Sequence, residues 1–253
     1  MTQGIKMIIR PKKIEELFRF LKKNHCYNKK IQEGFIEEWL SSYNTNDKRA
    51  LLILTRIVNS QSQPRLEPLA DFFASIQKNK PLNSFLDFIN FLQINSCDRN
   101  GLFNKLQNQP GWGPKTAALF IRNLALIEAE PRLNGRFWND INVLGSQIIK
   151  LPVDKVILSV FSTLQDNDTG PLDTFIKINK HLLETRKYKN NEMLIWDDLW
   201  FWGFITQKSK IGEAKRTHEW NVAKYWSIFT APKDQESIQK IECLANEFLQ
   251  IIN

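Results

Sequence analysis

The residues best suited to chemistry lie in the run PGWGPKTAA at positions 110–118. Gly111 and Gly113 flank one apolar residue, and glycine accepts the positive φ angles of a tight turn without a Cβ penalty. Pro114 suits the first position of a following helix, where its missing N–H is not needed. Outward-pointing amides of such a turn, with those of the helix start, bind anions such as a DNA phosphate. An ordinary helix–helix corner has the same glycine spacing, so the pattern leaves both interpretations open.

A carboxylate stands at a second predicted helix start. Pro152, Val153 and Asp154 directly precede an apolar, helix-type sequence. Asp is preferred at such a position because its side chain accepts hydrogen bonds from the first amides of the helix. The residue by itself therefore predicts no more than a helix cap.

The elements that must position these residues are helices. Apolar residues recur at helical spacing almost throughout the chain, and strict alternation is absent apart from a possible short strand near 6–9. The expected helical stretches are 14–21, 31–40, one from about 47, 69–76, 85–92, about 102–106, 115–129, 136–149, 153–165, 171–184, 194–207, 213–228 and 235–252. We expect an all-α protein with short connections, folded as one domain of two closely packed helical subdomains.

Composition narrows the class of protein. The 253 residues carry 35 Lys and Arg against 27 Asp and Glu, a net charge of +8, which is compatible with a polyanionic partner. Three cysteines and three histidines are scattered, so we expect no protein-held metal or iron–sulfur cluster. No stretch resembles a signal peptide or approaches the length of a spanning helix, so we expect an intracellular protein without a membrane partner.

The run PGWGPKTAAL resembles the helix-hairpin-helix signature of base-excision DNA glycosylases, and the PVD run at 152–154 resembles the second half of that signature. NSQSQ at 59–63 is similar to a Gln-containing stretch that lies near the extruded base in this family. LIWDDLW at 194–200 is similar to a helix of the archaeal 8-oxoguanine glycosylases, which have a comparable length and lack the iron–sulfur cluster. The resemblance covers roughly residues 47–205. It places the hairpin at about 98–129, the catalytic Asp segment at 150–165 and an inserted segment at about 129–150.

This resemblance implies a glycosylase with AP-lyase activity on double-stranded DNA that contains a damaged base, most plausibly 8-oxoguanine. Lys115 would be the nucleophile that forms a Schiff base, and Asp154 would stabilise the positive charge on the sugar. Gly111, Trp112, Gly113 and Lys115 would bind DNA phosphate. A monomer without a cofactor is implied, although a monovalent cation could bind at the hairpin loop.

Candidates for the base pocket come from the same resemblance and from the aromatic content. An extruded base needs an aromatic surface to replace its lost stacking. Phe120 and Trp200 or Trp202 are candidates for stacking, and Gln61 and Asp198 or Asp197 for hydrogen bonding. Each of the aromatic residues, taken singly, is more typical of a packed core. Gln61 is equally well explained as a solvated residue after a helix end.

The chain also departs from the family pattern. Lys115 and Asp154 are 154 − 115 = 39 residues apart, longer than in most members. The inserted segment carries Arg132, Arg136, Phe137 and Trp138, and is expected to be an added helix or a longer DNA-contacting loop. Three other functions therefore stay open: excision of a different damaged base, non-catalytic DNA binding through the hairpin, and an all-α scaffold that binds protein.

Overall fold

The computed structural model describes residues 12–61, 63–94, 100–164, 171–208 and 216–253. Most of these residues are helical, which confirms the predicted all-α class. The strands in these ranges are two residues long each, β1 Gln207–Lys208 and β2 Thr217–His218, and they pair antiparallel.

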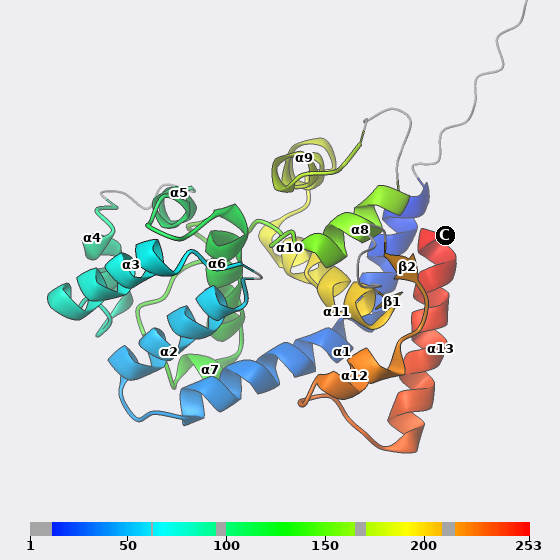
Figure 1. Ribbon diagram of the computed structural model, residues 1–253, viewed down its shortest axis with the longest axis horizontal. Coiled ribbons are helices and arrows are strands. Elements are labelled where there is room, and N and C mark those ends of the chain that lie inside the picture. Colours follow the sequence, from blue (N-terminus) through cyan, green and yellow to red (C-terminus); the bar gives the residue numbers. More distant parts are fainter. Residues whose placement is uncertain (1–11, 62, 95–99, 165–170, 209–215) are drawn as a thin grey trace, which may run out of the picture. The chain divides into compact units, whose positions relative to one another are not determined.

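Most neighbouring helices are joined by short connections, but the 20 residues 135–154 separate α7 from α8 (Figure 1). In chain order they are α1 Lys12–Ser41, α2 Asn46–Asn59, α3 Leu66–Asn79, α4 Phe85–Phe91, α5 Gly101–Gln107, α6 Pro114–Ala129, α7 Pro131–Asn134, α8 Lys155–Thr163, α9 Phe175–Lys180, the π-helical turn η1 His181–Thr185, α10 Asn190–Trp196, α11 Asp198–Ile205, α12 Val222–Ser227 and α13 Gln235–Ile252.

The chain divides into two compact units. Unit 1 comprises 1–28, 153–186 and 195–253, and unit 2 comprises 29–152 and 187–194. The long helix α1 contributes its first part to unit 1 and its second part to unit 2.

Helix α6 is the centre of unit 2. Its sequence is apolar on nearly every face, so eleven of its sixteen residues are buried, and it contacts α2, α5 and α7. One of the buried residues is charged: Arg122 donates from Nη1 to the side-chain oxygens of Gln32 and Asn123, at 2.9 and 2.8 Å. A buried guanidinium requires such partners, so this network links α6 to α1.

Helix α11 is the corresponding centre of unit 1, where it contacts α8, α12 and α13. Gly203 is the point of closest approach, because a Cβ there would lie 2.8 Å from Val156 Cγ1 and 3.2 Å from Val160 Cγ2 of α8. Any side chain at this position would therefore push the two helices apart.

Several predicted boundaries differ from the structure. The stretch 235–252 is confirmed as α13, but the separate segments 14–21 and 31–40 belong to the continuous helix α1. The helix predicted at 136–149 is wrong: this stretch is irregular, with Trp138 Nε1 donating to the Leu82 carbonyl oxygen at 2.8 Å. The helix predicted at 213–228 is replaced, over 216–228, by β2 and the shorter α12. The strand predicted near 6–9 lies outside the described residues.

Candidate functional site

The glycine-containing turn at 108–113 joins α5 to α6. Gly111 adopts the left-handed conformation, with φ of +77°, and the Trp112 N–H closes the turn by donating to the Gln109 carbonyl oxygen at 3.0 Å. Gln61 Nε2 donates to the Gly111 carbonyl oxygen at 3.3 Å. The two predicted features, the turn and the Gln-containing stretch after α2, are therefore in direct contact within unit 2.

The two glycines of the turn have different reasons to be glycine. A Cβ on Gly111 would lie 2.5 Å from Leu69 Cγ, and the positive φ independently disfavours any other residue. Gly113 has an extended backbone with φ of −154°, and no heavy atom would lie within 4 Å of a Cβ there. The fold therefore requires Gly111, whereas Gly113 leaves open space beside the start of α6.

Backbone amides without a hydrogen-bond acceptor are found at the start of α6. Pro114 has no N–H, and the N–H groups of Lys115 and Thr116 belong to the first turn of α6, where no intrahelical acceptor exists. No side chain caps this helix start. The amides of Gly113, Lys115 and Thr116 donate to no acceptor within the described ranges. Three unused donors at one helix start suit an anion.

The expectation that Trp112 binds phosphate is wrong, because neither its amide nor its side chain is available. The amide closes the turn, and the indole is 3% exposed, packed edge-on against Phe72 and Phe120 at centroid distances of 5.3 and 6.1 Å. The residue anchors the turn to the core of unit 2.

Lys115 is half-buried at the second position of α6 in unit 2. It forms no ion pair with a carboxylate in the part of the chain that the structure describes. Its amine is therefore not tied to a structural partner.

Asp154 caps α8 in unit 1, as its sequence position predicts. Its Oδ1 accepts hydrogen bonds from the Val156 and Ile157 amides, both at 2.9 Å. Oδ2 accepts none from the described residues, and the side chain is partly exposed. One oxygen thus fixes the carboxylate and the other remains for a ligand.

Phe120 is not an open stacking surface, and its prediction as a base-pocket residue is wrong. Its ring is 1% exposed and packs against Phe88, with centroids 5.6 Å apart, and against Trp112. The residue lies five positions after Lys115, on the face of α6 that the core covers.

Asp198 is fully buried in unit 1, so its prediction as a base-reading residue is also wrong. Its two oxygens contact His25 Nδ1 and Asn28 Nδ2, each at 2.9 Å. Burial raises the pKa of this carboxyl to about 7, against the opposing effect of the His25 contact. Asp197 and Trp202, the alternatives, are also buried, so none of the three presents a surface to a base.

Trp200 is the predicted stacking residue that remains partly exposed. Its ring stacks on that of Phe204, with centroids 5.4 Å apart and an interplanar angle of 9°. Lys224 Nζ lies 5.0 Å from the centre of the Phe204 ring, and burial lowers the pKa of this lysine. Stacked rings beside a cation suit contacts with nucleobases or the DNA backbone.

Lys150 is a candidate that sequence reasoning missed. Its Nζ lies 3.9 Å from the centre of the Phe103 ring on α5, and burial lowers its pKa. Among the described carboxylates none pairs with it. An amine with a lowered pKa beside α5 is a second candidate for a nucleophile. Nothing in the sequence distinguishes it from the other lysines, because only packing places it on the ring.

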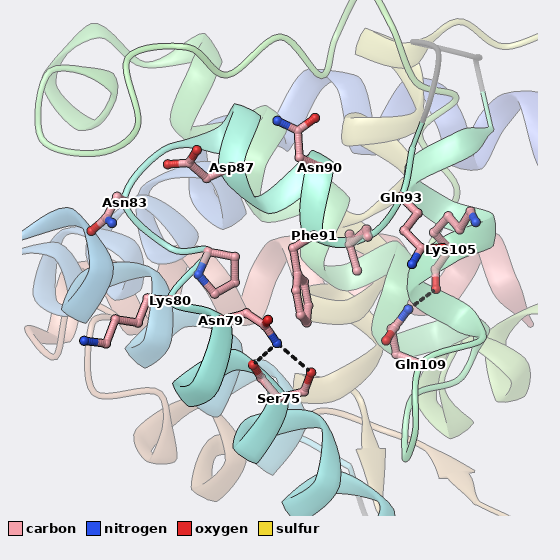
Figure 2. Close-up of a pocket in the computed structure, with 12 residues that line it drawn as sticks. Ser75, Asn79, Lys80, Asn83, Asp87, Asn90, Phe91, Gln93, Lys105 and Gln109 are labelled. Carbon is pink, nitrogen blue, oxygen red and sulfur yellow. Dashed lines mark hydrogen bonds between the residues drawn. The ribbon is translucent and has the colours of Figure 1, made fainter.

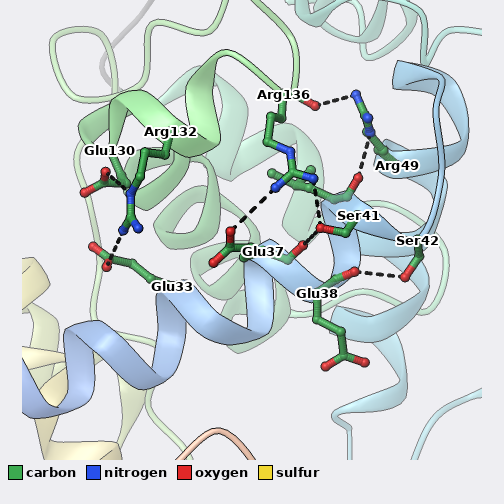
Figure 3. Close-up of polar contacts among 10 residues, drawn as sticks. Glu33, Glu37, Glu38, Ser41, Ser42, Arg49, Glu130, Arg132 and Arg136 are labelled. Atoms are coloured by element: carbon green, nitrogen blue, oxygen red, sulfur yellow. Dashed lines mark hydrogen bonds and ion pairs between the residues drawn. The ribbon is translucent and has the colours of Figure 1, made fainter.

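The inserted segment 129–150 is held by unit 2 and does not present its arginines freely (Figure 3). Arg132 pairs with Glu130 at 3.0 Å and Glu33 at 3.6 Å, and Arg136 pairs with Glu37 at 3.6 Å. Phe137 and Trp138 are buried. Of the two alternatives expected for this segment, the structure favours the longer loop, which contains the four-residue helix α7, and its contact with DNA stays a prediction.

Lysines are frequent in two further stretches, 177–189 and 208–216, and some of them are paired with carboxylates. Lys208 pairs with Glu219 at 3.1 Å and Lys177 with Asp173 at 2.9 Å, while Lys210 and Lys215 lie outside the described residues. Across the described ranges, no three His, Cys, Asp or Glu side chains are grouped as metal ligands, and no helix has the length and apolarity to cross a bilayer.

Comparisons with protein-family models, curated proteins and solved structures found no match for this chain. Function must therefore be argued from the residues and their geometry.

Proposed function

We propose that this protein is a DNA glycosylase with AP-lyase activity that removes an oxidised purine, most plausibly 8-oxoguanine. The observation that carries the proposal is the α5–turn–α6 arrangement. Gly111 is fixed by the fold, a Cβ on Gly113 would meet no heavy atom within 4 Å, and three amides and the Lys115 amine at this helix start have no partner among the described residues. In this proposal α5 and α6 form a helix-hairpin-helix that holds a DNA phosphate.

Lys115 supplies the nucleophile. Its neutral amine attacks C1′ of the damaged nucleotide, the glycosidic bond breaks, and the base leaves with a proton. The resulting amine at C1′ opens the sugar ring and becomes an imine. Loss of a C2′ proton from this imine then expels the 3′ phosphate and cleaves the strand. The electron pairs balance without an oxidant or a metal.

Asp154 supplies the fixed negative charge. Breaking the glycosidic bond places positive charge on the sugar, and a carboxylate held beside it stabilises that state. The two N–H donors to Oδ1 hold the carboxylate in one orientation, while Oδ2 stays available.

Borohydride trapping tests the nucleophile. A duplex that contains 8-oxoguanine should give a covalent adduct with the wild-type chain, because borohydride reduces the imine to a stable amine. Lys115→Gln should lose the adduct and keep DNA affinity, and Lys150→Gln should keep both. Trapping that survives in Lys115→Gln but disappears in Lys150→Gln would instead assign the nucleophile to Lys150. Trapping only with an AP site or another lesion would discard the 8-oxoguanine assignment.

The variant Asp154→Asn distinguishes a catalytic role of Asp154 from its role as the cap of α8. Asn is as good an N-cap as Asp, so the free energy of unfolding should change by less than about 1 kcal/mol. Base release should fall by at least about 100-fold, because the fixed charge is lost. If Asp154→Asn excises the base at the wild-type rate in single-turnover assays, Asp154 has no catalytic role and only caps α8.

A non-catalytic DNA-binding protein is the second candidate. The observation that favours it is the cap itself, because two hydrogen bonds to Oδ1 explain Asp154 without any chemistry. This candidate predicts salt-sensitive duplex binding with neither trapping nor base release on any lesion.

A further inference from the structure

A polar cavity of about 820 Å³ lies in unit 2, lined by residues of α3, α4, α5 and their connections (Figure 2). Its volume is within the range of small-molecule sites. None of the sequence-predicted site residues lines it. Its wall is rich in carboxamides, contributed by Asn79, Asn83, Asn90, Gln93 and Gln109.

These carboxamides keep unused hydrogen-bonding capacity. Asn79 Nδ2 donates to the Ser75 carbonyl oxygen at 2.9 Å, and Gln109 Nε2 donates to the Lys105 carbonyl oxygen at 3.1 Å, which leaves both amide oxygens as acceptors. The side chains of Asn83, Asn90 and Gln93 form no hydrogen bond with another described residue. Groups that both donate and accept match the edges of nucleobases, which carry donors and acceptors side by side.

An aromatic ring stands among these amides. Figure 2 shows Phe91 in the middle of the group, with Lys80 toward one side and Lys105 toward the other. Phe91 is half-buried and stacks on Phe88 of the core, with centroids 6.4 Å apart and an interplanar angle of 23°. Neither lysine pairs with a carboxylate of the described residues. A base on the ring would therefore have a cation on each side for its flanking phosphates.

The backbone at two cavity residues is unusual. Lys80 and Gln93 have φ of 48° and 56°, and within the described ranges Lys187 is the other non-glycine residue with a positive φ. Glycine adopts this conformation with less strain than any residue with a Cβ. Both residues stand at the C-terminal end of a helix, where a left-handed residue commonly ends the helix, so glycine can replace either one without a change of backbone conformation.

We propose that this cavity binds one nucleotide of a single-stranded nucleic acid. The base stacks on Phe91, its edge bonds to the carboxamides, and Lys80 and Lys105 contact the phosphates on either side. Asp87, which also lines the cavity, accepts a hydrogen bond from an exocyclic amino group such as that of cytosine. This binding does not depend on Lys115 or Asp154.

The test uses the full chain and a fluorescein-labelled oligodeoxycytidine, with anisotropy measured across a range of salt concentrations. Phe91→Leu keeps an apolar side chain against Phe88 but removes the stacking face, so affinity should fall about tenfold. Lys80→Gly should weaken binding and reduce the magnitude of the salt slope by about 0.7, the value for one phosphate contact on a single strand. Gln93→Gly should weaken binding at an unchanged salt slope. Both glycine variants relieve a positive φ, so their thermal midpoints should equal or exceed that of the wild type.

Lys187→Gly is the matched control, because it removes one positive charge from the same backbone conformation outside the cavity. It should leave affinity close to that of the wild type. A 5-iododeoxycytidine in the probe should crosslink on irradiation to the peptide that carries Phe91. Equal losses in Lys80→Gly and Lys187→Gly, or a crosslink elsewhere with none at Phe91, would overturn the proposal. Because the probe carries no damaged base, neither result depends on the proposed excision chemistry.

Discussion

The two glycines of the turn between α5 and α6 should respond in opposite ways to the same added methyl group. In Gly111→Ala the new Cβ would meet Leu69 Cγ at 2.5 Å and Leu69 Cδ2 at 2.6 Å, at a φ of +77°. The left-handed conformation costs an L-residue about 1–2 kcal/mol, and overpacking adds about 1–3 kcal/mol. Alanine also lowers the conformational entropy of the unfolded chain, which stabilises the folded state by about 0.4–1 kcal/mol. We therefore expect Gly111→Ala to lower the free energy of unfolding by about 3 kcal/mol.

Gly113→Ala meets neither obstacle, because its backbone is extended and the space around a Cβ is open. Its free energy of unfolding should match or slightly exceed that of the wild type, by up to about 1 kcal/mol. If the proposed phosphate sits against the amides at the start of α6, the same methyl group stands between them and the ligand. Affinity for a duplex that contains an AP-site analogue should then fall several-fold.

Urea unfolding followed by circular dichroism gives the stability of both variants, and fluorescence anisotropy gives duplex affinity. A loss below about 0.5 kcal/mol in Gly111→Ala would refute the packing argument, since overpacking and strain each exceed that value. Unchanged duplex affinity in Gly113→Ala, with the fold intact, would remove the phosphate from this helix start. Gly111→Ala thus tests how the turn is packed, and Gly113→Ala tests whether the turn binds phosphate.

Two further predictions concern unit 1. Burial raises the pKa of Asp198 from 3.8 to about 7. Between these two pH values the folded chain keeps a proton on this carboxyl that the unfolded chain releases. The carboxyl therefore stabilises the folded state fully below about pH 4, and this contribution is lost as the pH rises toward 7. Asp198→Asn should flatten the pH dependence of the urea midpoint over that interval, and parallel profiles for the two chains would contradict the assignment. Gly203→Ala should cost about 1–3 kcal/mol, because its Cβ would overlap Val156 Cγ1 at 2.8 Å, and Val156→Ala in the same chain should recover part of the loss in a double-mutant cycle.

Local features of the sequence were sufficient for some of these positions. The apolar stripe at 235–252 predicts α13 because a helix repeats every 3.6 residues, and Ile241, Ala245, Phe248 and Ile252 of this stripe are buried. Asp154 is predicted as a cap, and Gly111 as part of a tight turn, because hydrogen bonds and φ angles within a few residues decide both. The structure confirms these predictions.

Predictions that required knowing what covers a side chain failed. Periodicity places Phe120 on the helix that carries Lys115, but only the packing of Phe88 and Trp112 decides that its ring is enclosed. The stretch 136–149 has helix-like spacing of apolar residues, yet contacts such as Trp138 with the Leu82 carbonyl hold it as an irregular segment. Tertiary contacts override local propensity where the buried area and the hydrogen bonds come from distant residues.

The chain by itself determined the helical class, the turn with its two glycines and the cap at Asp154, because those features depend on neighbours along the sequence. Only the tertiary structure decided that Asp198 is buried against His25 and Asn28, and that Lys150 lies on the Phe103 ring. It also decided that the carboxamides of α3, of α4 and of the connections that follow α3, α4 and α5 line one cavity around Phe91. The physical reason is that helical spacing shows which face of a helix is apolar, whereas burial and proximity depend on which other helix lies against that face.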